Sequence, residues 1–133
     1  SIRLGSERCV TGRPRWHQPT RGYTAQPSLA VEFVQRPPEG SQAFLPMTQN
    51  HVLVIVAPDE DGAPGRPLAF RTAPGQGINF YHNVWHGVLT PLFAPGLFAV
   101  VDRIGNSVNL EEYWFETPFT VQERDMKDIQ ELQ

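Results

Sequence analysis

Amide, phenol and imidazole side chains gather in one short stretch of the chain, residues 75–86. Its alternating pattern is typical of a β-strand and places Asn79 and Tyr81 on one face, which we predict to point into the mouth of a barrel. His82 and His86 follow across a turn. Groups of these types can hold a small molecule and deprotonate it near neutral pH. The same pattern also fits a strand with a structural aromatic residue and a surface histidine.

Further candidates lie where short strands begin or end. Gln42, within 40–46, would polarise a carbonyl or urea group if it points inward, and is otherwise a solvent-facing residue. Arg103 can bind a carboxylate through two parallel hydrogen bonds, although an ion pair at the rim is the alternative. Glu111 and Glu112 are adjacent, so one of them can face the interior of a strand as a general base or metal ligand.

The composition limits the classes of function. A net charge of −3 argues against nucleic-acid binding, and the chain has no phosphate-binding loop or dinucleotide fingerprint, so we expect no nucleotide cofactor. Lys127 is the single lysine among 11 basic residues, and arginine favours a small carboxylate ligand. Cys9 is the single cysteine, which excludes an intrachain disulfide. No run approaches the ~18 apolar residues of a membrane span, and no signal peptide is evident, so we expect a cytoplasmic protein.

The elements that must position these residues are short β-strands. Thirteen prolines and 11 glycines divide the chain into short segments, as in many-stranded β proteins. We predict strands over residues 29–34, 41–46, 51–57, 67–71, 76–81, 86–92, 97–102 and 107–115. This series predicts an all-β protein built as a closed or two-sheet barrel.

Two of the segments carry sharper predictions. Residues 52–57 form a continuous apolar run rich in β-branched residues, which indicates a strand buried on both faces. Residues 59–62 then form an exposed turn, because acidic residues are followed by glycine.

The chain length favours one domain over residues 1–133. Residues 1–27 are expected to be irregular, since prolines alternate with arginines and aromatic residues. At the other end, Thr120 and Glu123 match a helix capping box, which predicts a short C-terminal helix over 118–133.

Taken in order, several short segments resemble one known family. They are Gly-Ser-Gln-Ala-Phe-Leu-Pro-Met (40–47), Val-Leu-Val-Ile-Val-Ala-Pro (52–58), Ala-Phe (69–70), Gly-Gln-Gly-Ile-Asn-Phe (75–80), Asn-Val-Trp-His (83–86), Phe-Ala-Val-Val-Asp-Arg (98–103) and Asn-Leu-Glu-Glu (109–112). In this combination the chain resembles the bacterial ureidoglycolate lyases, from about Val31 to Glu112. The resemblance implies a cupin-like β-barrel, or jelly roll, that forms a homodimer. It also implies a carbon–nitrogen lyase that cleaves ureidoglycolate to glyoxylate and urea in allantoin degradation, a part of purine metabolism.

The resemblance gives each candidate residue an expected role. His86 or His82 is predicted to be the general base that removes the hydroxyl proton of the substrate. Tyr81 or a water molecule would return a proton to the leaving nitrogen. The expected substrate-binding residues are Gln42 and Asn79 for the ureido group, Arg103 or Arg71 for the carboxylate, and Trp85 and Phe44 for the pocket walls.

A divalent metal is also implied by the resemblance, and His86, Gln42 and Glu111 are its candidate ligands in this chain. The family commonly carries histidine at three positions that hold other residues here, namely Pro37, Tyr81 and Gly87. Proline and glycine offer no side-chain ligand, so we expect the family-type metal site to be incomplete.

Two other functions remain open at this stage. The barrel could be an enzyme that acts on another small hydroxy acid, which predicts turnover of a different substrate. It could also be a non-catalytic barrel that binds a small acid, which predicts binding without turnover and without metal.

Overall fold

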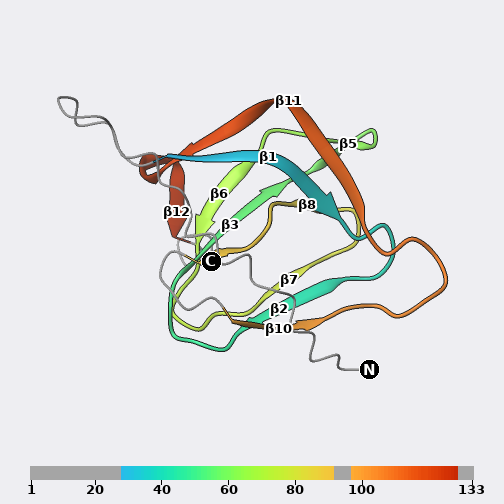
Figure 1. Ribbon diagram of the computed structural model, residues 1–133, viewed down its shortest axis with the longest axis horizontal. Helices are drawn as coiled ribbons and strands as arrows, with labels where there is room; N and C mark the ends of the chain where they lie inside the picture. Colours follow the sequence, from blue (N-terminus) through green and yellow to red (C-terminus); the bar gives the residue numbers. More distant parts are fainter. Residues whose placement is uncertain (1–27, 92–96, 129–133) are drawn as a thin grey trace.

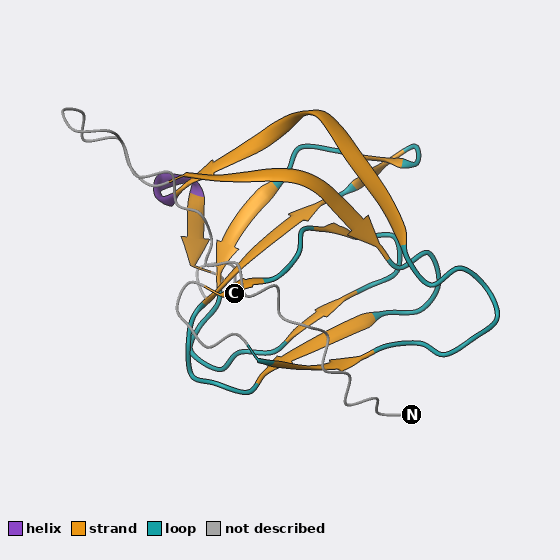
Figure 2. Ribbon diagram, in the orientation of Figure 1, coloured by secondary structure: helices purple, strands orange, loops and turns teal. Residues whose placement is uncertain are grey.

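The computed structural model describes residues 28–91 and 97–128, and its regular structure is nearly all β-strand (Figures 1 and 2). The strands are β1 (Ser28–Arg36), β2 (Gln42–Pro46), β3 (Val52–Ala57), β4 (Asp59–Glu60), β5 (Ala63–Pro64), β6 (Leu68–Arg71), β7 (Ile78–Phe80), β8 (Trp85–His86), β9 (Thr90–Pro91), β10 (Phe98–Val101), β11 (Glu111–Gln122) and β12 (Met126–Asp128). Each predicted strand corresponds to one or two of these. The described part of the chain contains no helix that is long and apolar enough to cross a bilayer.

The strands form two facing sheets and a small hairpin. The larger sheet has the order β11-β1-β8-β3-β6-β12, with β9 also paired to β3, and the smaller sheet has the order β10-β2-β7. Strands β4 and β5 pair with each other. Figure 1 shows the larger sheet curling above the smaller one, as in a half-barrel. The prediction of an all-β, cupin-like barrel is therefore confirmed.

Strand β3 lies in the middle of the larger sheet and is buried on both faces, as its sequence predicted. Leu53 and Ile55 point to one side, whereas Val54 points to the other. Their exposed fractions are 1%, 3% and 2%. Because burying one such side chain contributes about 1.5–3 kcal/mol, this strand is a main source of stability.

Two apolar clusters lie on opposite sides of β3. The β11-side cluster contains Val31, Val34, Leu53, Ile55, Ala57, Ala69, Trp85 and Val121, and Phe115 and Phe119 of β11 pack against it. The inter-sheet cluster contains Val54, Phe70 and Phe80, with Phe44, Val56, Ile78, Val84 and Leu89 packed around them. The second cluster joins residues of both sheets, so it lies between them.

The predicted turn at 59–62 is the tip of the β4–β5 hairpin. Asp61 and Gly62 form its two-residue loop, with φ angles of 53° and 87°. Two consecutive positive φ angles match the twist of an antiparallel hairpin, and Asp-Gly is a preferred pair for such a turn.

The C-terminal helix predicted over 118–133 is wrong for residues 118–128. Strand β11 continues to Gln122, a single 3-10 turn, η1, spans Glu123–Asp125, and β12 then pairs in parallel with β6. The reason is that Phe119 and Val121 follow a two-residue period and both pack into the β11-side cluster. Residues 129–133, like the expected irregular segment 1–27, lie outside the described ranges.

Candidate active site

His86 is a buried imidazole between the two sheets. It lies on β8, opposite Gln35 of β1 and Val56 of β3, and its exposed fraction is 2%. Its ring stacks on Phe80, with centroids 4.0 Å apart and 9° between the planes. Phe44 meets it edge-on at 6.2 Å. Two aromatic rings of the smaller sheet therefore fix the orientation of this imidazole.

The contacts of His86 also define which nitrogen carries the proton. Nδ1 lies 3.2 Å from the carbonyl oxygen of Gly87, which can only accept a hydrogen bond, so Nδ1 carries the hydrogen. Nε2 is then an acceptor, and it is buried without a partner among the described residues. Burial lowers the pKa of His86 below 6.5, partly opposed by the Gly87 contact and by the charge of Asp102. The neutral form is therefore favoured, with its lone pair on Nε2.

Gln42 faces the same interior. It lies two residues before Phe44 on β2 and pairs in register with Phe80, so its side chain shares the inner face of the smaller sheet. Its amide nitrogen Nε2 donates to Oδ2 of Asp102 at 3.2 Å. Its oxygen Oε1 is buried, and nothing in the described part of the chain bonds to it. A second buried acceptor thus belongs to a residue on the inner face of the smaller sheet.

Sequence reasoning missed Asp102 and Asn109 as site candidates. Asp102 follows β10, whose Val101 pairs with Ala43, so the register brings Asp102 opposite Gln42. Oδ1 of Asn109 is another buried acceptor that has no partner within residues 28–91 and 97–128. The pairing of β2 with β10 could have identified Asp102, but a strand order is not readable from one sequence.

The expectation that Asn79 and Tyr81 point into the barrel is wrong. On β7 it is Phe80 that is buried, whereas Asn79 is exposed and Tyr81 is 70% exposed. His82 lies in the exposed turn that follows. The alternation was predicted correctly, but the apolar side of the strand faces inward. Of the three predicted catalytic residues, the structure therefore places His86 inside and Tyr81 and His82 outside.

Both arginines predicted for the carboxylate have acidic partners within the protein. Arg103 Nη2 lies 2.8 Å from Glu39 Oε2, and its Nη1 donates to Ser107 at 2.9 Å. Arg71 Nε pairs with Asp128 at 2.7 Å, which lowers the pKa of that carboxyl. Each guanidinium group is therefore engaged in an ion pair with a carboxylate of the chain.

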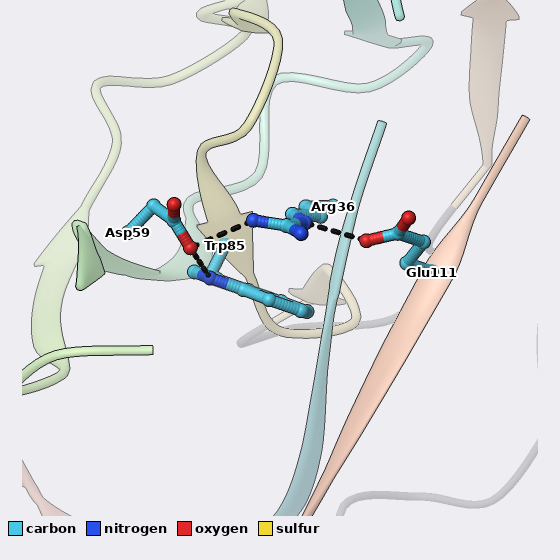
Figure 3. Close-up of polar contacts among 4 residues, drawn as sticks. All are labelled: Arg36, Asp59, Trp85 and Glu111. Atoms are coloured by element: carbon cyan, nitrogen blue, oxygen red, sulfur yellow. Dashed lines mark hydrogen bonds and ion pairs between the residues drawn. The ribbon is translucent and has the colours of Figure 1, made fainter. Parts of the chain in front are cut away.

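Trp85 and Glu111 belong to a separate polar cluster centred on Arg36 (Figure 3). Arg36 pairs with Asp59 and Glu111, at 2.7 Å each, and its guanidinium lies 4.5 Å from the Trp85 ring centroid. Trp85 Nε1 donates to Asp59 at 2.9 Å. Because Trp85 precedes His86 on β8, its side chain leaves on the opposite face and packs in the β11-side cluster. Trp85 and Phe44 consequently do not wall one pocket.

The residues described do not fit a protein-held divalent metal. Glu111 lies in the Arg36 cluster, on the other side of β8 from His86. Asp102 uses both oxygens, since Oδ1 also accepts the Arg103 N–H at 2.8 Å. Within 28–91 and 97–128, no three His, Cys, Asp or Glu side chains group as a metal site. His86 and Gln42 would supply one nitrogen and one oxygen, fewer than the three protein ligands typical of a catalytic zinc site.

Comparisons with known proteins find the same family that the short segments of the sequence resemble. The family model described as ureidoglycolate lyase matches residues 7–122. Ureidoglycolate lyase 2 of Rhizobium meliloti is 56% identical over 94 residues, which cover 71% of this chain and 58% of that protein. The ureidoglycolate lyase of Chelativorans sp. is 50% identical over 101 residues, covering 76% and 61%. That of Rhodobacter capsulatus is 55% identical over 92 residues, covering 69% and 57%. The chain thus spans about three fifths of the length of these relatives.

Proposed function

This chain belongs to the ureidoglycolate lyase family, and from that premise we propose that it cleaves ureidoglycolate to glyoxylate and urea. The observation that supports the proposal is the buried pair of acceptors, His86 Nε2 and Gln42 Oε1, in the inter-sheet space. A neutral imidazole with a free lone pair is the form that a general base needs.

The reaction requires little beyond proton transfer. Ureidoglycolate carries a hydroxyl and a ureido nitrogen on the same carbon. When the hydroxyl proton is removed, the oxygen forms a carbonyl with that carbon, the carbon–nitrogen bond breaks, and the nitrogen takes up a proton. The products are glyoxylate and urea, and no net proton is released.

In the proposed mechanism, His86 handles the proton in both directions. Nε2 accepts the hydroxyl proton, and the imidazolium then delivers it to the leaving nitrogen. The negative charge of Asp102 favours the imidazolium while it exists. Gln42 Oε1 accepts a hydrogen bond from the ureido group, and Phe44 and Phe80 exclude water from the reacting atoms. Proton transfer by a positioned base contributes about 10²–10⁴-fold in rate.

The proposal extends to a homodimer that acts in the cytoplasm, in the degradation of allantoin. Exposed apolar residues support self-association: Trp114 of β11 is 60% exposed and stacks on Phe33 of β1 at 4.5 Å. Sedimentation of the purified chain tests this part, and a monomer at micromolar concentration would contradict it.

The test of the main proposal is glyoxylate release from racemic ureidoglycolate by the purified chain. We expect release above the uncatalysed background, and a 10²–10⁴-fold loss of kcat in His86→Phe, about the contribution of a general base. His51→Asn is the control, because asparagine can keep the hydrogen bond that His51 Nδ1 makes to the Thr72 carbonyl at 2.6 Å. His82→Phe tests the other imidazole predicted from the sequence.

Two outcomes would overturn the proposal. If release does not exceed the background, the chain is not this lyase, and the other small hydroxy acids or a non-catalytic binding role must be tested. If His86→Phe keeps full turnover, His86 is not the base.

A further inference from the structure

The two unpaired groups beside the Phe44 and Phe80 rings are both hydrogen-bond acceptors. His86 Nε2 is an acceptor because Nδ1 carries the hydrogen, and Gln42 Oε1 is an acceptor by nature. Burying a polar atom without a partner costs free energy, so a ligand that donates hydrogen bonds would recover what the folded protein loses.

Asp102 determines which end of the Gln42 amide is free. A carboxylate accepts and does not donate, so the nitrogen of Gln42 must face Asp102 and the oxygen must face away from it. The Asp102 carboxylate is itself held in place, because its other oxygen accepts a hydrogen bond from the backbone N–H of Arg103 at 2.8 Å. Two hydrogen bonds in series therefore fix the orientation of the amide.

We infer that Asp102 is a positioning residue that presents Gln42 Oε1 to the ligand, and that the site selects its ligand by the N–H donors of a ureido group. The inference rests on the proposed function and adds how the substrate is recognised. A ureido group offers N–H donors and ureidoglycolate adds a hydroxyl donor, whereas a carboxylate or an ester group offers none. Gln42 Oε1 therefore recognises the ureido N–H groups, whereas His86 Nε2 accepts from the hydroxyl group.

The experiment measures binding separately from turnover. N-methylurea is titrated into the chain and its methyl signal is followed by saturation-transfer NMR, with methyl acetate as a probe of similar size that has no N–H. We expect binding of N-methylurea and at least tenfold weaker binding of methyl acetate. In Asp102→Asn the new side chain can donate, the Gln42 amide can turn over, and binding of N-methylurea falls at least fivefold.

Kinetics on the same variant separate positioning from general damage to the fold. We expect Asp102→Asn to raise KM for ureidoglycolate more than it lowers kcat, and Gln42→Met to lose the binding of N-methylurea in the same way. Asp61→Asn is the control, since Asp61 lies in the exposed β4–β5 turn. Melting temperatures report whether each variant folds. If Asp102→Asn does not fold, the loss of N-methylurea binding is measured in Gln42→Met instead.

The binding and turnover measurements distinguish a failure of this inference from a failure of the lyase proposal. If Asp102→Asn and Gln42→Met bind N-methylurea as tightly as the unmodified chain, or if methyl acetate binds equally well, the inference is wrong even when turnover is present. If N-methylurea binding depends on Asp102 but no glyoxylate is released, recognition of the ureido group stands and the lyase proposal fails.

Discussion

The ring of His86 lies flat on the ring of Phe80, one from each sheet, with 4.0 Å between the centroids. A histidine in this position lowers the free energy of unfolding relative to an apolar ring. It is desolvated, its Nε2 has no partner within the described residues, and an aromatic hydrocarbon ring would fill the same space. Such a residue is expected where function, rather than packing, determines its type.

The first prediction concerns the pH dependence of stability. The pKa of His86 is below 6.5 in the folded chain and near 6.5 in the unfolded chain. Between these two values the unfolded state binds more protons, so the free energy of unfolding falls as the pH drops below 6.5. His86→Phe removes this dependence. We expect the variant to be within about 1 kcal/mol of the parent at pH 7.5, because the ring stack is kept.

As the pH falls below 6.5, the free energy of unfolding of His86→Phe should rise relative to that of the unmodified chain by at most about 1.4 kcal/mol per pH unit. Urea denaturation of both chains from pH 7.5 to 5 measures the difference. A constant difference over this range would show that His86 titrates normally in the folded state.

The second prediction concerns the Arg36 cluster. Arg36 joins β1 to β11 through Glu111 and to the start of β4 through Asp59, and it covers the Trp85 ring. Its side chain is 15% exposed, so water screens these contacts only partly. We expect Arg36→Met to lose about 2 kcal/mol, since each charged hydrogen bond contributes about 1.5–3 kcal/mol when well buried and less near the surface.

Thermal unfolding measures this loss, and Arg66→Met is the control because Arg66 is exposed. Turnover per folded molecule should remain unchanged in Arg36→Met, since the cluster lies on the opposite side of β8 from His86. A fall in kcat that is not matched by unfolding would instead link the cluster to the site.

The third prediction concerns Gly62 in the β4–β5 turn. A Cβ added there would meet no atom within 4 Å, yet the φ angle of 87° is strained for a side chain. Gly62→Ala should therefore cost about 1 kcal/mol through backbone conformation alone. Gly62→Asn should cost less, because asparagine tolerates positive φ angles. Equal losses in the two variants, measured by denaturation, would contradict this explanation.

Much of the fold was predictable because β-strands leave a local signal. The burial of β3 on both faces follows from its continuous apolar run, and the Asp61-Gly62 turn from the preference of that pair for positive φ angles. The strand at the C-terminal end was not predictable. The capping-box pattern of Thr120 and Glu123 favours a helix there, whereas the tertiary packing of Phe119 and Val121 favours a strand. Packing decides between the two, and packing is not local.

The site was predictable in part for a similar reason. His86 and Gln42 were identified by side-chain type; His86 is buried, and Gln42 is half-buried with a buried amide oxygen. The inward face of β7 was assigned wrongly, since alternation separates Asn79 from Phe80 without saying which of the two faces the core. Asp102 was missed because its position opposite Gln42 depends on the register of β2 with β10.

The fourth prediction concerns metal dependence. The donors described near His86 fall short of a metal site, and the mechanism proposed above needs only proton transfer. We expect glyoxylate release to be unchanged after dialysis against EDTA, with less than a tenth of an equivalent of any divalent metal in the active protein. Loss of turnover on dialysis, restored by one added metal, would show that ligands from outside the described residues complete a site.

The last prediction tests whether a histidine at position 87 would restore such a site. Gly87 follows His86 along the chain, and a Cβ there would lie 3.3 Å from Cβ of Ile55, which belongs to the β11-side cluster. A side chain at 87 therefore leaves away from His86 Nε2 and crowds a buried strand. Gly87→His should lower stability by about 1–3 kcal/mol through overpacking and should not increase Mn²⁺ binding. Gly87→Ala separates the two effects, because it adds the Cβ without a ligand. Isothermal titration of Mn²⁺ checks the result, and tight binding by Gly87→His alone would mean that the two imidazoles can converge.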